Sequence, residues 1–337
     1  MNNVGQLPRL VMTRTPLRIS FAGGGSDLPG FFKKEPGAVV SSTIDKYLYV
    51  TVKQHANLFS EQYRLNYSES EQAQNIDDIQ NTIARECLKL IPVAPPLYIN
   101  TIADIPSSSG LGSSSAFAVG LLHALHAFRG EQVSPRQLAE EAAYIEIDIL
   151  KHPIGKQDQY ATAFGGLNFI RFKPKGAISL EPLNLNEIIQ EELFDHVMMF
   201  WTGLTRNASD VLAEQNDRIP QTIGQIRNMK LLADNMRSIA QNNFDAKKFG
   251  SILNDCWEVK RTLASGITSA QIDQWHQSGI NAGAYGGKLC GAGGGGFLMF
   301  VAAPGRHDDI RKALKELIEL TVNYEGQGSR LILNEEG

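Results

Sequence analysis

The strongest constraint on the fold of this chain is a run of small residues, Pro106-Ser107-Ser108-Ser109-Gly110-Leu111-Gly112-Ser113-Ser114-Ser115. A strand pattern, Leu97 to Ala103, leads into the run, and apolar residues at helical spacing follow it. Small residues let a turn approach a ligand closely, and the first amides of the next helix have no intrahelical partners and attract anions. The run therefore predicts a cradle for nucleotide phosphates. The alternative, a flexible Ser/Gly linker, is rarely flanked so tightly by apolar patterns.

This cradle, residues 106–115, is not a Walker A loop, because no lysine follows its glycines to reach the phosphates. Successive amides in such a turn form a concave nest for oxyanions. The hydroxyls of Ser113 and Ser114 are neutral oxygen ligands suited to a hard cation such as magnesium.

Composition narrows the class of protein. A length of 337 residues allows two domains, and a net charge of -4 argues against a nucleic-acid or membrane-surface binder. Cys87, Cys256 and Cys290 are odd in number and widely spaced, which indicates reduced thiols rather than a disulfide frame or a metal site. Residues 1–14 lack a signal-peptide core. We expect a cytoplasmic protein that binds small molecules, as a monomer or homodimer.

The order of the expected elements is strands, then helices, then strands. This order is typical of an α+β protein rather than of a regular βαβ alternation. We expect an N-terminal domain over residues 1–190 and a C-terminal domain over residues 191–337. The strand patterns cover residues 11–22, 38–44, 47–55, 64–67, 97–103, 167–172, 178–183, 196–201, 284–290, 296–302 and 328–333. The helix patterns include residues 77–90, 135–149, 156–163, 202–219, 222–242, 246–263, 269–279 and 308–320.

Two further glycine loops flank the cradle in the chain, at Gly23-Gly24-Gly25 and at Gly291-Ala292-Gly293-Gly294-Gly295-Gly296. Each follows a predicted strand. One such loop is weak evidence of function, but three in this order are hard to explain as ordinary turns. For the third loop, a structural hairpin tip that serves tight packing alone stays an alternative.

Together these motifs resemble the GHMP kinase family, which is named for galactokinase, homoserine kinase, mevalonate kinase and phosphomevalonate kinase. The resemblance rests on residues 16–27, on Pro106 and residues 110–114, and on residues 290–294. It implies a two-domain α+β fold, with an N-terminal domain like ribosomal protein S5 domain 2 and a ferredoxin-like C-terminal domain. It also implies ATP as the phosphate donor and Mg²⁺ as the metal.

The resemblance assigns roles to two acids. Glu146 matches the acid that holds magnesium, here together with Ser114, and Asp158 matches the acid near the acceptor hydroxyl. Glu146 lies at the edge of a predicted buried stripe, where a carboxylate is costly unless paired with a cation. Alternatives are a solvated helix flank for Glu146 and a surface charge for Asp158. Asp148 is a lower-ranked alternative acid on the same helix.

The remaining candidates face the acceptor. Arg18 and Asp27 keep a sugar-kinase spacing of nine positions: Arg18 would pair with Asp158 or with developing negative charge, and Asp27 would accept hydrogen bonds from sugar hydroxyls. Arginines near strand ends also often only tether loops. The other predicted substrate-binding residues are Gly24, Gly25, Ser26, Arg206, Gly293 and Gly294.

Gly24 and Gly25 stand where galactokinases have a Glu-His pair, which leaves room for a bulky or anionic substituent. Together with residues 155–159 and 202–208, this resembles the branch of the family that contains heptose 7-phosphate kinases and fucose-type kinases. Arg206 is the candidate for a substrate phosphate, with Lys156 and Arg14 as weaker ones. Each of these three is equally expected to be a solvated surface charge.

The sequence thus predicts an ATP-dependent sugar 1-kinase, with heptose 7-phosphate as the favoured substrate. Alternatives are a kinase of a neutral sugar (fucose, mannose or galactose type) and a non-catalytic sugar and ATP sensor on the same fold. No motif marks the adenine contacts, for which residues 41–53 and 54–65 are spatial candidates only.

Overall fold

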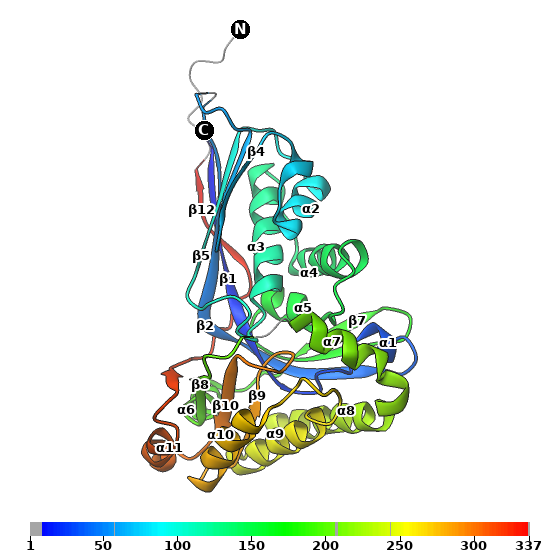
Figure 1. The fold of residues 1–337 in the computed structure, drawn as a ribbon, viewed down its shortest axis with the longest axis vertical. Coiled ribbons are helices and arrows are strands. Elements are labelled where there is room, and N and C mark those ends of the chain that lie inside the picture. Colours follow the sequence, from blue (N-terminus) through cyan, green and yellow to red (C-terminus); the bar gives the residue numbers. More distant parts are fainter. Residues whose placement is uncertain (1–8, 57, 206–207, 243, 336–337) are drawn as a thin grey trace.

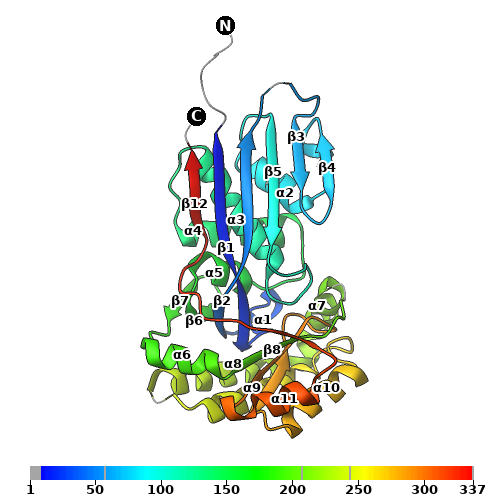
Figure 2. The ribbon, with the colours of Figure 1, turned by 90° about the vertical axis from the view of Figure 1, so that its left-hand side faces the viewer.

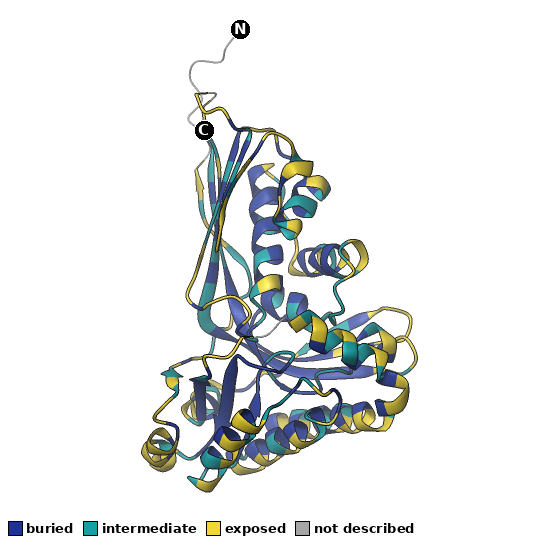
Figure 3. Cartoon of the chain, in the orientation of Figure 1, coloured by how far each residue is buried: buried dark blue, intermediate teal, exposed yellow. Residues whose placement is uncertain are grey.

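A computed structural model describes residues 9–56, 58–205, 208–242 and 244–335 of the chain. Two sheets, each covered by helices, meet near the middle of the molecule (Figure 1). Figure 3 shows that buried residues gather where the helices pack on the sheets. In the described part of the chain, no helix is long and apolar enough to cross a membrane.

The first sheet is built around one long strand, β2 (Gly37–Gln54). β1 (Leu10–Ala22) pairs with β2 along most of the length of β1. On the other side of β2, β6 (Leu167–Phe172) pairs with the first part of β2 and β5 (Leu97–Ala103) with the second part. The strand order is β12-β1-β2-β5-β3-β4, and β7 (Ile178–Pro182) extends the sheet beside β6. The outer strands are β3 (Tyr63–Asn66), β4 (Ser70–Ala73) and β12 (Arg330–Glu335).

Helices cover one face of this sheet, as Figures 1 and 2 show. They are α2 (Thr82–Leu90), α3 (Ser113–Phe128), α4 (Pro135–Ala143) and α5 (Gln157–Phe164). α3 is buried along almost its whole length, because alanine, leucine and glycine on all its sides pack on β1, β2 and the neighbouring helices. The loop that follows β5 leads directly into α3, so the core fixes the position of the helix start.

The second sheet has the antiparallel order β11-β8-β10-β9, which is the ferredoxin-like order when its strands are numbered along the chain. Its strands are β8 (Val197–Trp201), β9 (Gly286–Leu289), β10 (Phe297–Val301) and β11 (Ile318–Leu320). The helices of this part are α7 (Ala208–Asp217), α8 (Ile219–Asn242), α9 (Ala246–Lys260), α10 (Ala270–Asn281) and α11 (His307–Ala313). The α+β prediction is confirmed.

The predicted domain boundary falls inside α6 (Glu187–Asp195). The last strand, β12, comes from the second predicted domain but pairs with β1 in the first sheet. The division at 190/191 therefore stays a prediction.

Two predicted elements are wrong. Residues 38–44 and 47–55 are not two strands paired with each other but parts of β2, because Asp45 and Lys46 lack the positive φ that a two-residue hairpin turn requires. The helix expected over residues 308–320 ends at Ala313, and residues 318–320 form β11, because pairing with β8 overrides their helical pattern.

Candidate active site

The cradle adopts the predicted turn and helix start. Gly112 has a left-handed φ of 77° and immediately precedes α3, and Gly110 has a φ of 83°. The backbone N–H of Arg18 donates to the carbonyl of Leu111 at 3.0 Å, which ties the turn to β1. Five cradle residues line a large cavity of about 660 Å³: Pro106, Ser107, Ser108, Ser113 and Ser114. Ser109, Leu111 and Ser115 are buried beneath the turn.

The large cavity extends from the cradle between β5, α2 and α3. Its further walls include Tyr67, Asn81, Ile83 and Phe117. A mostly apolar cavity of this size is typical of a site for a nucleotide or similar cofactor. Of the two spatial candidates for adenine contacts, residues 41–53 contribute Leu48, and the described residues of 54–65 contribute none. The sequence missed these walls because they are ordinary apolar and amide side chains without a motif.

Glu146 lies beneath the start of α3 and is fully buried. It accepts hydrogen bonds from the Ser114 hydroxyl at 2.6 Å, the Ser115 hydroxyl at 2.8 Å and the Gln159 amide at 2.6 Å. Burial raises the pKa of Glu146 and outweighs these hydrogen bonds, which act in the opposite direction. The solvated-flank alternative is therefore wrong, and Asp148, the alternative acid, is exposed.

A turn of π-helix over residues 144–149 explains this burial. Such turns insert one extra residue into a helix and are frequent at functional sites. The turn changes the helical phase, so that Glu146 points inward while Ile149, which the helical pattern predicts to be buried, is 36% exposed. A regular periodicity of 3.6 residues cannot predict this change.

The surroundings of Glu146 fit a magnesium ion. Its hydrogen-bond partners in the described part of the chain are all neutral, so no protein cation balances the carboxylate. The described residues contain no group of three or more His, Cys, Asp or Glu that could hold a metal by themselves. Mg²⁺, however, is usually bound by one or two protein oxygens together with substrate phosphates. Glu146 and Ser114 supply such a pair at the edge of the cradle.

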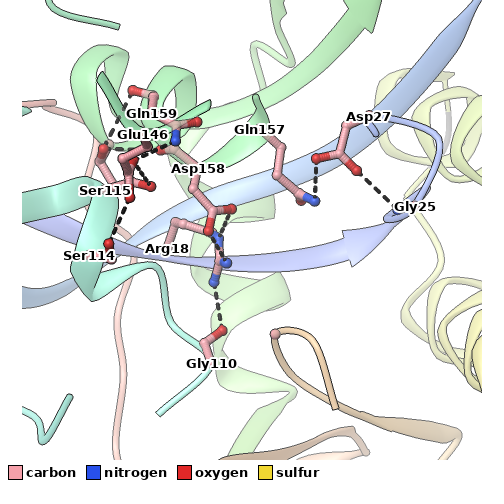
Figure 4. A network of polar contacts seen from close by, with 12 residues as sticks. Arg18, Gly25, Asp27, Gly110, Ser114, Ser115, Glu146, Gln157, Asp158 and Gln159 are labelled. Carbon is pink, nitrogen blue, oxygen red and sulfur yellow. Dashed lines mark hydrogen bonds and ion pairs between the residues drawn. The ribbon is translucent and has the colours of Figure 1, made fainter. Parts of the chain in front are cut away.

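Arg18 and Asp158 form the ion pair that the sequence anticipated, across 140 positions of the chain (Figure 4). The Arg18 guanidinium donates to the two Asp158 oxygens at 2.7 and 2.6 Å and to the carbonyl of Gly110 at 2.6 Å. Burial alone would lower the pKa of Arg18, but the Asp158 charge raises it above its usual value. Arg18 thus carries a permanent charge and connects Asp158 to the cradle.

Three consecutive side chains in the first turn of α5 each contact a different residue of the site. Gln157 donates to Asp27 at 2.9 Å, Asp158 pairs with Arg18, and Gln159 donates to Glu146 (Figure 4). The backbone N–H of Gly25 also donates to Asp27, at 3.0 Å. The sequence assigned no role to Gln157 or Gln159, and their only signal was their place in the run 155–159.

Asp27 is buried, at 2% exposure. Burial raises its pKa, and the negative charge of Asp158 raises it further. The two neutral donors fix the orientation of the Asp27 carboxylate. Its raised pKa makes it a stronger acceptor of hydrogen bonds from a polar ligand.

A small cavity of about 90 Å³ lies beside the Arg18–Asp158 pair and between the two parts of the chain. Arg18, Gly24, Gly25, Asp27 and Asp158, which the sequence analysis assigns to the acceptor side, line it together. Lining residues that the sequence analysis did not assign to the site include Lys260, Lys288, Gly291 and Ala292.

Three predicted substrate-binding residues are not among those that line the small cavity. Ser26 is buried and its hydroxyl donates to the carbonyls of Gly23 and Ala38. Gly293 packs on Ile267, and the N–H of Gly294 donates to the carbonyl of Ile267 at 2.9 Å. Direct contact of these three residues with a substrate stays a prediction.

The third glycine loop packs against the cradle. A Cβ atom on Gly291 would lie 2.4 Å from the Gly110 Cα, and one on Gly296 would lie 2.4 Å from the Ser109 carbonyl oxygen. Both glycines also have positive φ, so no other residue fits. The tight-packing explanation of these glycines therefore holds, and the same packing brings Gly291 to the small cavity.

Of the three predicted phosphate-binding cations, the two that the structure describes do not line the small cavity. Arg206 lies outside the described residues. Lys156 pairs with Glu140, and Arg14 pairs with Glu325, each at 3.5 Å, and neither lines the cavity.

An anion cradle with a large apolar cavity on one side and an arginine–carboxylate pair in a small polar cavity on the other is the arrangement of a small-molecule kinase. Comparison with protein families agrees: residues 76–166 match the GHMP kinases N terminal domain, and residues 225–320 match the GHMP kinases C terminal domain. The D-glycero-alpha-D-manno-heptose 7-phosphate kinase of Campylobacter jejuni is 30% identical over 91% of this chain and 94% of its own length. This chain belongs to the GHMP kinase family.

Other relatives agree with this assignment. A mevalonate kinase from Methanothermobacter thermautotrophicus is 27% identical over 82% of this chain and 86% of its own. Among solved structures, a D-glycero-D-manno-heptose 1-phosphate kinase from Bacteroides thetaiotaomicron superposes with a TM-score of 0.78 at 25% identity, over 96% of this chain and 99% of that one. The predicted family, fold and kinase activity are thereby confirmed.

Proposed function

We propose that the protein is an ATP-dependent sugar 1-kinase that phosphorylates D-glycero-D-manno-heptose 7-phosphate at its anomeric hydroxyl. The observation that carries the proposal is the Arg18–Asp158 pair, which joins the cradle to the small cavity. The names of the Campylobacter and Bacteroides relatives support a heptose phosphate as the acceptor.

On the donor side, the cradle amides would hold the ATP phosphates and the large cavity would hold the base. Ser114 and Glu146 would hold magnesium, which supplies charge neutralisation on the phosphates when bound. Gln159 and Ser115 keep the Glu146 carboxylate oriented through their hydrogen bonds.

On the acceptor side, the oxygen of the anomeric hydroxyl bonds to the γ-phosphorus of ATP, and the bond from that phosphorus to the oxygen bridging to the β-phosphate breaks. Asp158 accepts the proton that the hydroxyl loses. Arg18 holds Asp158 in place and stabilises negative charge that develops beside it. Phosphoryl transfer requires mainly positioning and charge neutralisation, so one acid, one arginine and the cradle are a sufficient set.

Asp27 would recognise hydroxyls of the sugar. Gly24 and Gly25 themselves place no side chain beside it, although Gln157 and Gln215 lie next to them. Arg206 remains our candidate, from the sequence alone, for contact with the substrate phosphate.

Two other functions receive specific support. The name of the Bacteroides structure places the phosphate of its acceptor at position 1, so heptose 1-phosphate is a second candidate acceptor. A similarity of 26% to an L-fucokinase/L-fucose-1-P guanylyltransferase from Bacteroides fragilis, which covers 94% of this chain and 38% of that protein, favours a neutral deoxyhexose as a third.

A panel assay tests the proposal. With Mg-ATP, ADP release is expected on heptose 7-phosphate with a kcat/KM at least about 10²-fold above that on fucose, mannose or galactose, a difference of about 2.7 kcal/mol. Phosphorus NMR of the product should show a new anomeric phosphate. A preference for heptose 1-phosphate, fucose or mannose would contradict the acceptor, and no ADP release on any of these sugars and sugar phosphates would leave only the non-catalytic sensor.

Gly155→Ala should selectively weaken acceptor binding. A Cβ atom on Gly155 would lie 1.9 Å from an Asp27 carboxylate oxygen, so the carboxylate must move. Loss of one charged hydrogen bond predicts a rise in acceptor KM of about 10-fold or more, with the KM for ATP unchanged. The matched control is Gly305→Ala, which has no atom within 4 Å of the added methyl group. An unchanged acceptor KM would remove Asp27 from substrate recognition.

A further inference from the structure

Two lysines in the small cavity are buried without a counter-charge. Lys260, the last residue of α9, and Lys288, in β9, are 7% and 3% exposed. Within the described residues, their ammonium groups donate to backbone carbonyl oxygens and to no carboxylate. The acceptors are Leu289 at 3.3 Å and Gly291 for Lys260, and Ser20 at 2.8 Å and Phe21 at 3.2 Å for Lys288.

None of the other titratable groups near these lysines, among the described residues, forms an ion pair with them. Arg18, on β1, is itself cationic, and it forms the ion pair with Asp158. Burial raises the pKa of the Cys256 thiol to about 11 and also raises that of the Cys290 thiol, so both are neutral near pH 7. Asp27 lines the same cavity, but its carboxylate is held by neutral donors and forms no ion pair with either lysine.

An unpaired buried ammonium is costly, and lysine is rarely fully buried unless it is paired. Burial, and then repulsion from Lys288, lowers the pKa of Lys260 to about 7. Burial also lowers the pKa of Lys288. Two such groups that line one cavity, each held by two carbonyl oxygens, are arranged to receive an anion that supplies the missing charge. A phosphate, with its double charge and several acceptor oxygens, fits two lysines best.

We propose that Lys260 and Lys288 together form the anion receptor of the small cavity and bind phosphate oxygens there. This inference rests on the proposed function, because it assigns residues to the acceptor side of the same site.

Phosphate oxygens could come from two sources. Lys260 contacts Gly291, which packs on Gly110 of the cradle. The Lys260 ammonium therefore lies in the part of the cavity that adjoins the proposed site of the phosphate donor, ATP. Lys288 is anchored on β1, at the residues that precede the first glycine loop. The receptor would thus bind either a phosphate substituent of the acceptor or the phosphoryl group during transfer.

The test compares Lys260→Met and Lys288→Met with the wild type in calorimetric binding and in steady-state kinetics. The ligands are heptose 7-phosphate, the same heptose without phosphate, and inorganic phosphate with saturating ADP in the cradle. Lys248→Met is the matched control, because Lys248 lies on the same helix, α9, with its side chain 70% exposed. Methionine keeps the length and apolar stem of lysine, so the variants are expected to fold.

If the receptor binds a substituent of the acceptor, each variant loses affinity for heptose 7-phosphate by about 10-fold or more and keeps its affinity for unphosphorylated heptose. If it binds the phosphoryl group in transfer, acceptor affinities stay unchanged and kcat falls by a similar factor on any acceptor. The proposal is overturned if the variants behave as the wild type, or if both sugars lose affinity equally.

Proton uptake gives an independent readout. At pH 8 a Lys260 amine with a pKa near 7 is mostly neutral, and a bound phosphate favours its ammonium form. Binding to the wild type should therefore take up a fraction of a proton, seen as a dependence of the binding enthalpy on the buffer, and Lys260→Met should lose it. If the wild type phosphorylates neither sugar, the proposed function fails, but binding of inorganic phosphate that depends on both lysines would still support the receptor.

Discussion

Replacing Asp158 by asparagine is expected to lower kcat by about 10²–10⁴-fold, the usual contribution of a general base. Asparagine keeps the shape of the side chain but cannot accept the proton of the attacking hydroxyl. It also removes the counter-charge of Arg18, whose guanidinium lies between this residue and the Gly110 carbonyl. ATP affinity should change little, because the Asp158 carboxylate pairs with Arg18, and neither residue lines the large cavity.

The measurement is a steady-state assay with heptose 7-phosphate, together with calorimetric titration of Mg-ATP. Loss of one partner from a buried ion pair also destabilises a protein, by about 3–5 kcal/mol in the extreme case, so thermal unfolding must show that the variant is folded at the assay temperature. Asp148→Asn is the matched control, since Asp148 is exposed and was the alternative acid. Turnover within about 3-fold of the wild type would exclude Asp158 as the base.

The sequence predicts well those parts of the fold whose ends are marked by residues typical of turns and loops. β5 begins and ends at the predicted residues, Leu97 and Ala103, and α3 begins at Ser113, inside the cradle and directly after Gly112. The predicted division of β2 into two strands is wrong. The polar residues Asp45 and Lys46 resemble a turn in the sequence, but in the sheet they lie where β2 changes partners from β6 to β5. A strand that pairs differently along its length has no signature in a single sequence.

In the candidate site too, some features could be predicted from the sequence and others could not. The pairing of Arg18 with Asp158 could be anticipated only through a family resemblance, because spacing alone says nothing about residues 140 positions apart. The roles of Gln157 and Gln159 depend on the phase of α5, and the burial of Glu146 depends on a π-helical turn. Lys260 reads as an ordinary helix-end lysine. For Lys288 a signal did exist, since a lysine inside an otherwise small and apolar strand, Gly286–Leu289, requires a reason.

Replacing Glu146 by glutamine is expected to lower kcat with Mg-ATP by about 10²–10³-fold, similar to the loss of one main electrostatic contact in other active sites. In glutamine, the amide oxygen can still accept hydrogen bonds from Ser115 and Gln159, and the amide nitrogen can donate to the Ser114 hydroxyl, so the fold around the start of α3 should persist. The lost negative charge, however, removes the carboxylate that would attract a divalent cation at the start of α3.

A structural role and a metal-binding role for Glu146 predict opposite effects on stability. Because burial raises its pKa, the ionised carboxylate is disfavoured in the folded protein, so glutamine should raise the melting temperature when no magnesium is present. With Mg-ATP the wild type should gain stability by ligand linkage, and the variant should gain less at the same concentration. Glu191→Gln, an exposed change on α6, is the control. If the variant melts lower without magnesium and responds to Mg-ATP as the wild type does, Glu146 supports the fold and does not hold the metal.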